Sequence, residues 1–187
     1  MKDEEPKVHV TGEQGEIVFK VIVIGDGSVG KTSLLKKYVK KQFEHEYLPT
    51  VGVNISKQPL KHKDNDVNLM LWDLAGQPQF FLLHKVYYNG ANGIFLVFDL
   101  TQSHTFTNIK NWYKEIVKYG LKDVPMILLE NKSDLAKERK IIQPMAENLM
   151  EQLGITVYYE TSALDGTNVE KAFEKITEMM YDKVKNS

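Results

Sequence analysis

Short apolar runs alternate with amphipathic segments along the chain. The apolar runs have the length of buried strands and cover residues 17–24, 67–72, 94–98, 126–129 and 156–159. Two segments, from Phe106 to Ile116 and from Val169 to Met180, place apolar side chains at steps of three and four, which is the spacing of one helix face. We expect both stripes to pack in the core. The alternation of strands and helices predicts an α/β fold with a parallel sheet.

Polar stretches predict how the elements connect. Residues 61–66 form a polar turn in this pattern, so a strand at residues 53–60 is expected to pair antiparallel with residues 67–72 as a hairpin. Residues 1–15 are expected to be a flexible tail before a single domain over residues 16–187. At 187 residues and 42% hydrophobic content, the chain is long enough for one sizeable core but short for two domains.

Composition narrows the class of protein. The 24 basic and 25 acidic residues nearly balance, so the charge predicts no nucleic-acid partner. The absence of cysteine excludes disulfides, thiolate metal sites and lipid anchors attached through cysteine, and no direct membrane anchor is expected. The sequence shows no apolar signal core and no run of roughly 18 apolar residues, so we expect a cytoplasmic protein.

A glycine-rich loop follows the first predicted strand. Gly25, Gly30, Lys31 and Thr32 match the pattern G-x-x-x-x-G-K-[ST], between that strand and a helix that begins near Lys31. Glycines, among them Gly27, let backbone N–H groups face the phosphates, while the lysine reaches the β- and γ-phosphates and the threonine binds Mg²⁺. A turn that binds nothing is the alternative, and the G-K-T ending argues against it. The loop alone leaves the base open, because ATPases and kinases share it.

Candidate metal and water ligands follow the strand at residues 67–72. Asp73 comes at its carboxyl end, where α/β sheets gather their ligands, and is expected to hold Mg²⁺. Gly76 would offer an N–H to the γ-phosphate and Gln77 would orient the attacking water. Thr50, in the preceding loop YLPTVG, would give Mg²⁺ a second hydroxyl while the γ-phosphate is present. Taken alone, either segment is also compatible with an ordinary turn.

The identity of the base is indicated by N-K-S-D and T-S-A. Asn131, Lys132 and Asp134 follow the fourth apolar run. The Asp134 carboxylate would accept from the N1–H and exocyclic amine of guanine, whereas adenine presents an unprotonated ring nitrogen there. Such polar matching rejects a wrong partner by about 10⁴ to 10⁵. Ala163 would aim its N–H at the guanine carbonyl while Ser162 braces the loop. An asparagine cap or surface turn is the alternative for N-K-S-D in isolation.

Five motifs occur in a fixed order: GDGSVGKT, YLPTVGV, WDLAGQ, NKSD and ETSA. Together they resemble the Ras superfamily of small GTPases, and YLPTVGV, YYNGA and LVFDLT are most similar to the Rab branch. The resemblance implies a P-loop NTPase three-layer sandwich, with a six-stranded, mostly parallel sheet flanked by five helices. It also implies nucleotide-sensing switch loops near Thr50 and over residues 73–88. Further nucleotide contacts are implied at Phe43, over the guanine ring, and at Ser28, Val29, Ser33, Tyr47 and Pro49.

The chain departs from this family at several positions. Leu164, still a candidate contact to the base, stands where the family usually has a lysine, and Glu130 stands where Rab proteins usually have glycine. Pro78 follows the catalytic glutamine and is expected to stiffen the switch. Gly27 retains the glycine that leaves room for Gln77 and for an incoming arginine.

The single arginine of the chain, Arg139, follows the base-reading motif and is badly placed to act as an arginine finger within the chain. We therefore expect slow intrinsic GTP hydrolysis that a partner protein accelerates. Lys31, Thr50 and Gln77 are the expected catalytic residues.

The favoured function is a monomeric switch that binds GTP or GDP with Mg²⁺ and changes the loops that effectors read. Exchange factors and GTPase-activating proteins are the other expected partners. A pseudo-GTPase with a permanent nucleotide is one alternative, which the complete catalytic set opposes. A P-loop ATPase or nucleotide kinase is another, which N-K-S-D opposes. A Rab-like role in membrane traffic would need recruitment through a partner or a missing C-terminal tail, because the sequence ends YDKVKNS.

Overall fold

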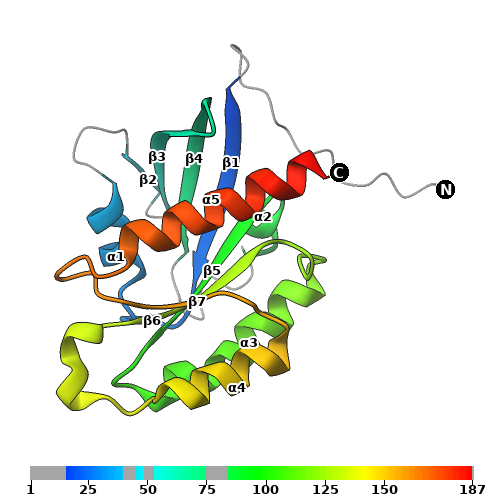
Figure 1. The fold of residues 1–187 in the computed structure, drawn as a ribbon. Coiled ribbons are helices and arrows are strands. Elements are labelled where there is room, and N and C mark those ends of the chain that lie inside the picture. The colour runs from blue at the N-terminus through cyan, green and yellow to red at the C-terminus, as the bar shows by residue number, and fades with distance from the viewer. Residues whose placement is uncertain (1–15, 40–44, 49–52, 75–83, 187) are drawn as a thin grey trace.

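The computed structural model describes residues 16–39, 45–48, 53–74 and 84–186 (Figure 1). One sheet contains β1 (Ile17–Ile24), β2 (His45–Leu48), β3 (Val53–His62), β4 (Asn65–Leu74), β5 (Gly93–Asp99), β6 (Met126–Asn131) and β7 (Tyr158–Thr161). The α-helices of the described part are α1 (Lys31–Tyr38), α2 (His84–Tyr88), α3 (Ser103–Lys118), α4 (Gln143–Leu153) and α5 (Val169–Lys185). A 3₁₀ helix, η3 (Ser133–Glu138), follows β6.

The sheet has the strand order β2-β3-β4-β1-β5-β6-β7 and is mostly parallel. Strand β1 is parallel to both of its neighbours, β4 and β5, and β6 is parallel to both β5 and β7. Strand β3 is antiparallel to its neighbours β2 and β4. The predicted hairpin is confirmed with longer strands, because only Lys63 and Asp64 form the turn, both with the positive φ that tight hairpins favour. All six predicted strands are present, and β2 adds a short seventh strand at the edge.

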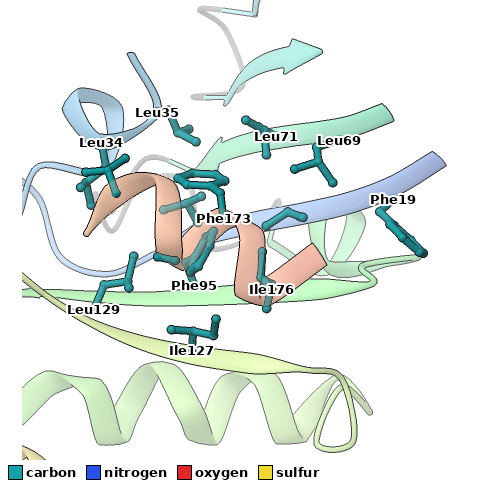
Figure 2. Packing of buried hydrophobic residues seen from close by; sticks show 14 of the residues in the cluster. Phe19, Leu34, Leu35, Leu69, Leu71, Phe95, Ile127, Leu129, Phe173 and Ile176 are labelled. Carbon is teal, nitrogen blue, oxygen red and sulfur yellow. The ribbon is translucent and has the colours of Figure 1, made fainter. Parts of the chain in front are cut away.

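Helices α1 and α5 cover one face of the sheet (Figure 1). Figure 2 shows Phe173 and Ile176 of α5 directed toward Phe95 of β5, with Leu34 of α1 nearby. The rings of Phe95 and Phe173 meet edge to face with 4.8 Å between their centroids, and the ring of Tyr38 of α1 stacks on that of Phe173 with 3.8 Å between centroids. The apolar stripe predicted near the C-terminus is therefore core packing, as expected.

A second apolar cluster fills the other face of the sheet. It includes Ile109, Trp112 and Ile116 of α3, which lie with Ile94 of β5 and Leu128 of β6. Helices on both faces make the three-layer sandwich predicted from the sequence. Across the described segments, no helix is both long and apolar enough to cross a membrane.

The carboxyl ends of the parallel strands meet at one edge of the sheet. The register places Val23 beside Asp73, and Asn131 between Asp99 and Thr161. Ligand sites of α/β sheets form at such an edge. The motifs that follow these strands are therefore brought together although they lie far apart in the sequence.

Candidate functional site

The glycine-rich loop, residues 25–30, connects β1 to α1 and is shaped by two glycines. Gly25 has φ +147° and Gly30 has φ +99°, both in the region that glycine adopts without strain. A Cβ atom at Gly25 would lie 2.1 Å from the carbonyl oxygen of Val97, and one at Gly30 would lie 2.2 Å from Nδ2 of Asn131. The loop thus packs directly against β5 and the end of β6. A Cβ atom at Gly27 would meet no atom of the described residues within 4 Å, and the expected room for Gln77 stays a prediction because Gln77 lies outside those residues.

Lys31, the first residue of α1, is buried beneath this loop. Its Nζ donates to the carbonyl oxygens of Gly25 at 2.8 Å and Asp26 at 2.7 Å. Burial lowers the pKa of Lys31 to about 8, although the nearby carboxylates of Asp73 and Asp26 oppose the shift. A desolvated ammonium group surrounded by carbonyl oxygens is suited to receive an anionic ligand.

Thr32 and Asp73 join α1 to the end of β4. The Thr32 hydroxyl donates to Oδ2 of Asp73 at 2.5 Å. Burial raises the pKa of the Asp73 carboxyl, and the bond from Thr32 and the charge of Lys31 oppose that shift. A hydroxyl and a carboxylate oxygen side by side are the hard ligands that Mg²⁺ prefers, with phosphate and water supplying the others. The pair therefore fits the predicted metal. Within the described segments, no cluster of three or more His, Asp or Glu side chains offers an alternative metal site.

Asn131, the last residue of β6, connects the three loops of the site. Its buried Nδ2 donates to the carbonyl oxygen of Val29 in the glycine-rich loop at 2.8 Å. Its Oδ1 accepts from the Thr161 hydroxyl, which begins the T-S-A segment, at 3.3 Å. Lys132 follows with a left-handed φ of +71°, which turns the chain sharply into η3. One amide side chain thus fixes the base-reading loops to the phosphate loop.

Asp134 is held by the T-S-A segment. The buried hydroxyl of Ser162 donates to Oδ1 of Asp134 at 2.6 Å and accepts from the N–H groups of Leu164 and Asp165, each at 3.2 Å. Ser162 thus braces the T-S-A loop, as the sequence predicted, and its bond to Asp134 also joins that loop to N-K-S-D. Ala163 follows Ser162 and is partly buried, whereas Leu164 is 76% exposed.

Comparisons with known proteins agree with this arrangement. The model of the Ras family matches residues 20–182. The chain belongs to the Ras family. This Ras-family chain is 36% identical to the Ras-related protein YPTC6 of Chlamydomonas reinhardtii, over 92% of its own length and 80% of that protein. It is 37% identical to the Ras-related protein Rab-25 of Homo sapiens, over 93% and 81% respectively. It is 34% identical to the GTP-binding protein ypt1 of Schizosaccharomyces pombe, over 92% and 84%.

As a member of the Ras family, the chain is a small GTPase, a switch that binds GTP or GDP with Mg²⁺ and hydrolyses GTP. Several predicted contacts lie outside the described residues: Phe43, Pro49, Thr50, Gly76, Gln77 and the neighbouring Pro78. Tyr47 lies in β2, where its backbone pairs with that of Asn54. Ser28, with φ +65°, and Ser33 are exposed on the glycine-rich loop and the first turn of α1.

Two carboxylates of this Ras-family site were not predicted from the sequence. Oδ1 of Asp26, in the glycine-rich loop, accepts from Nδ2 of Asn108 at 2.5 Å and from Nε1 of Trp112 at 2.8 Å. Both donors lie on α3, so this bond network ties the loop to a helix of the opposite layer. Nothing in the sequence signals the pairing, because it depends on how α3 lies across the sheet.

Asp99, the last residue of β5, is the second carboxylate that was not predicted from the sequence. It forms an ion pair of 2.6 Å with Lys132 and accepts from the Thr101 hydroxyl at 2.8 Å. Burial raises the pKa of Asp99, but the bonds from Lys132 and Thr101 outweigh burial and hold this pKa below its usual value. The rule that found Asp73, an acid at the carboxyl end of a parallel strand, would also have found Asp99.

Proposed function

We propose that the site of this small GTPase has a phosphate and metal half and a base half. In the first half, Lys31 binds the β- and γ-phosphates, while Thr32 and Asp73 hold Mg²⁺, joined by Thr50 in the GTP-bound form. Bound Mg²⁺ neutralises charge that develops on the phosphate oxygens. The backbone of the glycine-rich loop and nearby residues complete this half: Gly27, Ser28, Val29, Gly30, Ser33, Tyr47, Pro49 and Gly76.

In the base half, Asp134 reads the N1–H and exocyclic amine of guanine. Phe43 covers the ring, Lys132 is a further nucleotide contact, Ala163 donates its N–H to the guanine carbonyl, and Leu164 lies beside the base. The observation that carries this proposal is the bond from Asn131 to the Val29 carbonyl, at 2.8 Å. Because that bond links the two halves directly, the phosphates and the base are recognised as parts of one ligand.

For hydrolysis, we propose that Gln77 orients the attacking water and that a partner protein supplies an arginine. Arg139, the one arginine of the chain, is already paired with Glu130 at 2.7 Å and Glu160 at 2.6 Å. That engagement supports slow turnover without a partner, because no other guanidinium exists in the sequence.

The proposed mechanism is tested by single-turnover hydrolysis with GTP and Mg²⁺ and no partner. We expect the wild type to turn over at a rate on the order of 10⁻⁴ to 10⁻² s⁻¹. Gln77→Leu removes the amide that positions water, so hydrolysis should slow about tenfold or more, while GTP affinity stays unchanged.

Three results would count against this mechanism. They are a partner-free rate near that of an activated GTPase, a Gln77→Leu rate equal to that of the wild type, and complete retention of GTP after days in buffer. The last result would favour the pseudo-GTPase alternative.

We also propose a Rab-like role in membrane traffic, supported by the similarity to Rab-25 and ypt1. Effectors, exchange factors and GTPase-activating proteins would read or change the nucleotide state of a monomer. Recruitment to membranes would occur through a partner or a lipidated tail. The GTPase domain would span residues 16–187, after a flexible segment over residues 1–15.

A further inference from the structure

Glu130 is a fully buried acid in β6, directly before the base-reading motif. Its side chain is 0% exposed, and the next residue is Asn131, which ties the loops of the site together. A buried carboxylate is costly unless partners satisfy it. Rab proteins usually have glycine at this position, so the partners of Glu130 indicate which contacts the acid adds.

Arg139 is the main partner of Glu130 and closes the loop that carries Asp134. Its Nη1 donates to Oε1 of Glu130 at 2.7 Å and to the carbonyl oxygen of Ile141 at 3.2 Å. Arg139 directly follows η3, the segment that contains Asp134. The two ends of this segment are thus held together through one guanidinium.

The same guanidinium also holds the start of the T-S-A segment. Nη2 of Arg139 donates to Oε2 of Glu160 at 2.6 Å. Glu160 precedes Thr161 and is the register partner of Glu130 in the parallel pair β6–β7. Arg139 therefore joins the two strands that lead into the base-reading loops, at the second-last residue of each strand.

Tyr158 completes this cluster by donating its hydroxyl to Oε2 of Glu130. Burial raises the pKa of Glu130, and the bonds from Tyr158 and Arg139 oppose that shift while the charge of Glu160 adds to it. The carboxylates of Glu130 and Glu160 share the guanidinium of Arg139, so both ion pairs form only when the three side chains hold one relative position. Glu130 is buried, whereas Arg139 and Glu160 are partly exposed, and an ion cluster with a buried member is weak evidence for net stability.

We propose that Glu130, acting through Arg139, is a positioning residue for guanine recognition. It fixes the ends of both loops, so that Asp134 and Ser162 meet the base in one arrangement. This inference rests on the proposed role of Asp134 in reading guanine. Because Glu130 is fully buried, its effect reaches the base only through the loops.

The test compares the dissociation of ribose-labelled GDP and IDP, each with Mg²⁺, from the wild type and Glu130→Gln. IDP lacks the exocyclic amine, so its binding depends less on the alignment of Asp134. In the variant, GDP should dissociate about tenfold faster and IDP less than threefold faster, because one guanine contact is weakened selectively. The preference for GDP should therefore fall. Glu178→Gln, which removes a carboxylate from the exposed pair with Lys175, should leave both rates unchanged.

Equal acceleration for GDP and IDP, or no acceleration, would overturn the inference and leave the proposed function standing. A wild type with no preference for GDP over IDP would instead overturn the role of Asp134, and this inference with it. If Glu130→Gln does not fold, Tyr158→Phe removes the hydroxyl that bonds to Glu130 and, at 3.4 Å, to Glu160, and should shift the preference in the same direction by a smaller factor. An unchanged preference in that variant would also contradict the positioning role.

Discussion

At the scale of single residues, Lys20 has an unusual position. Its Nζ donates to the carbonyl oxygen of Asn89 at 2.9 Å and lies over the ring of Trp72, 3.8 Å from the centroid. Burial lowers the pKa of Lys20 to about 8, well below its usual 10.5. Folding therefore disfavours the charged ammonium of Lys20, and at neutral pH this lowers the free energy of unfolding.

We predict that the free energy of unfolding of Lys20→Met falls relative to that of the wild type as pH rises. Between about pH 8 and 10.5 the unfolded chain binds more protons at this site than the folded chain, so the free energy of unfolding of the wild type increases with pH. After discounting for solvent screening, the difference between the two proteins should shift by about 1–2 kcal/mol between pH 7 and pH 10. Urea unfolding at both pH values measures it.

A matched control for this titration is Lys61→Met, which changes an exposed lysine of the β3–β4 hairpin. Its effect on the free energy of unfolding should be small at either pH. A pH-independent difference for Lys20→Met would show that burial does not shift the titration of Lys20.

The motif residues of the site were predictable because each motif is a short contiguous run after a strand. Asp73 and Asn131 could be assigned from spacing, since parallel strands end at one edge. The partners of Glu130 could not be predicted in this way. Glu160 meets it through the register of β6 with β7, and Arg139 meets it through the path of η3, neither of which has a sequence signal.

At the scale of elements, α5 lies close to β5 at Gly93. A Cβ atom at Gly93 would lie 2.7 Å from Sδ of Met180 and 2.9 Å from Cγ1 of Ile176. Real Cβ contacts are longer, so the helix can approach the strand this closely only because residue 93 has no side chain. The glycine sets the distance between the two layers here.

We predict that Gly93→Ala lowers the free energy of unfolding by about 1–3 kcal/mol, because the added methyl forces α5 away from the sheet. Denaturant unfolding measures the change. In a Met180→Ala background the same substitution should cost less, since the nearest atom is gone. Equal costs in both backgrounds would mean that the contact with Met180 does not limit the approach of α5.

Element types were predicted better than their ends. The stripes in α3 and α5 were found from periodicity, but β7 begins at Tyr158, two residues later than expected, and ends at Thr161. Pairing with β6 draws the polar Glu160 into the strand, which a search for apolar runs excludes. For the same reason β2 was missed, since HEYL is too short and polar to be recognised without its partner β3.

At the scale of the whole molecule, the proposed ligand spans the sheet. Thr32 and Asp73 lie on the β1–β4 side, whereas Asp134 and Ser162 lie beyond β6 and β7. A ligand that binds only the folded chain stabilises it by about 4 kcal/mol at a thousandfold excess over its Kd. Nucleotide and metal should therefore stabilise both halves together.

Removal of Mg²⁺ by EDTA should accelerate GDP dissociation at least about tenfold, because the phosphates lose a hard cation. The Tm of the GDP-loaded protein should fall by about 2–4 °C for each kcal/mol of binding free energy lost. Fluorescent GDP release and thermal unfolding measure these effects. Excess Mg²⁺ should restore both values, and a dissociation rate that ignores Mg²⁺ would contradict the role of Thr32 and Asp73.

The order of the chain has a consequence for its synthesis. Phe173 and Ile176, near the C-terminus, cover the face of the sheet to which β1 contributes Phe19 near the other end (Figure 2). A chain emerging from the ribosome thus leaves an apolar side of its first strands uncovered until α5 has been made. The T-S-A segment also emerges late, so guanine cannot stabilise a partial product. We expect the nascent protein to expose this apolar face, and to bind nucleotide poorly, until β7 and α5 have both left the ribosome.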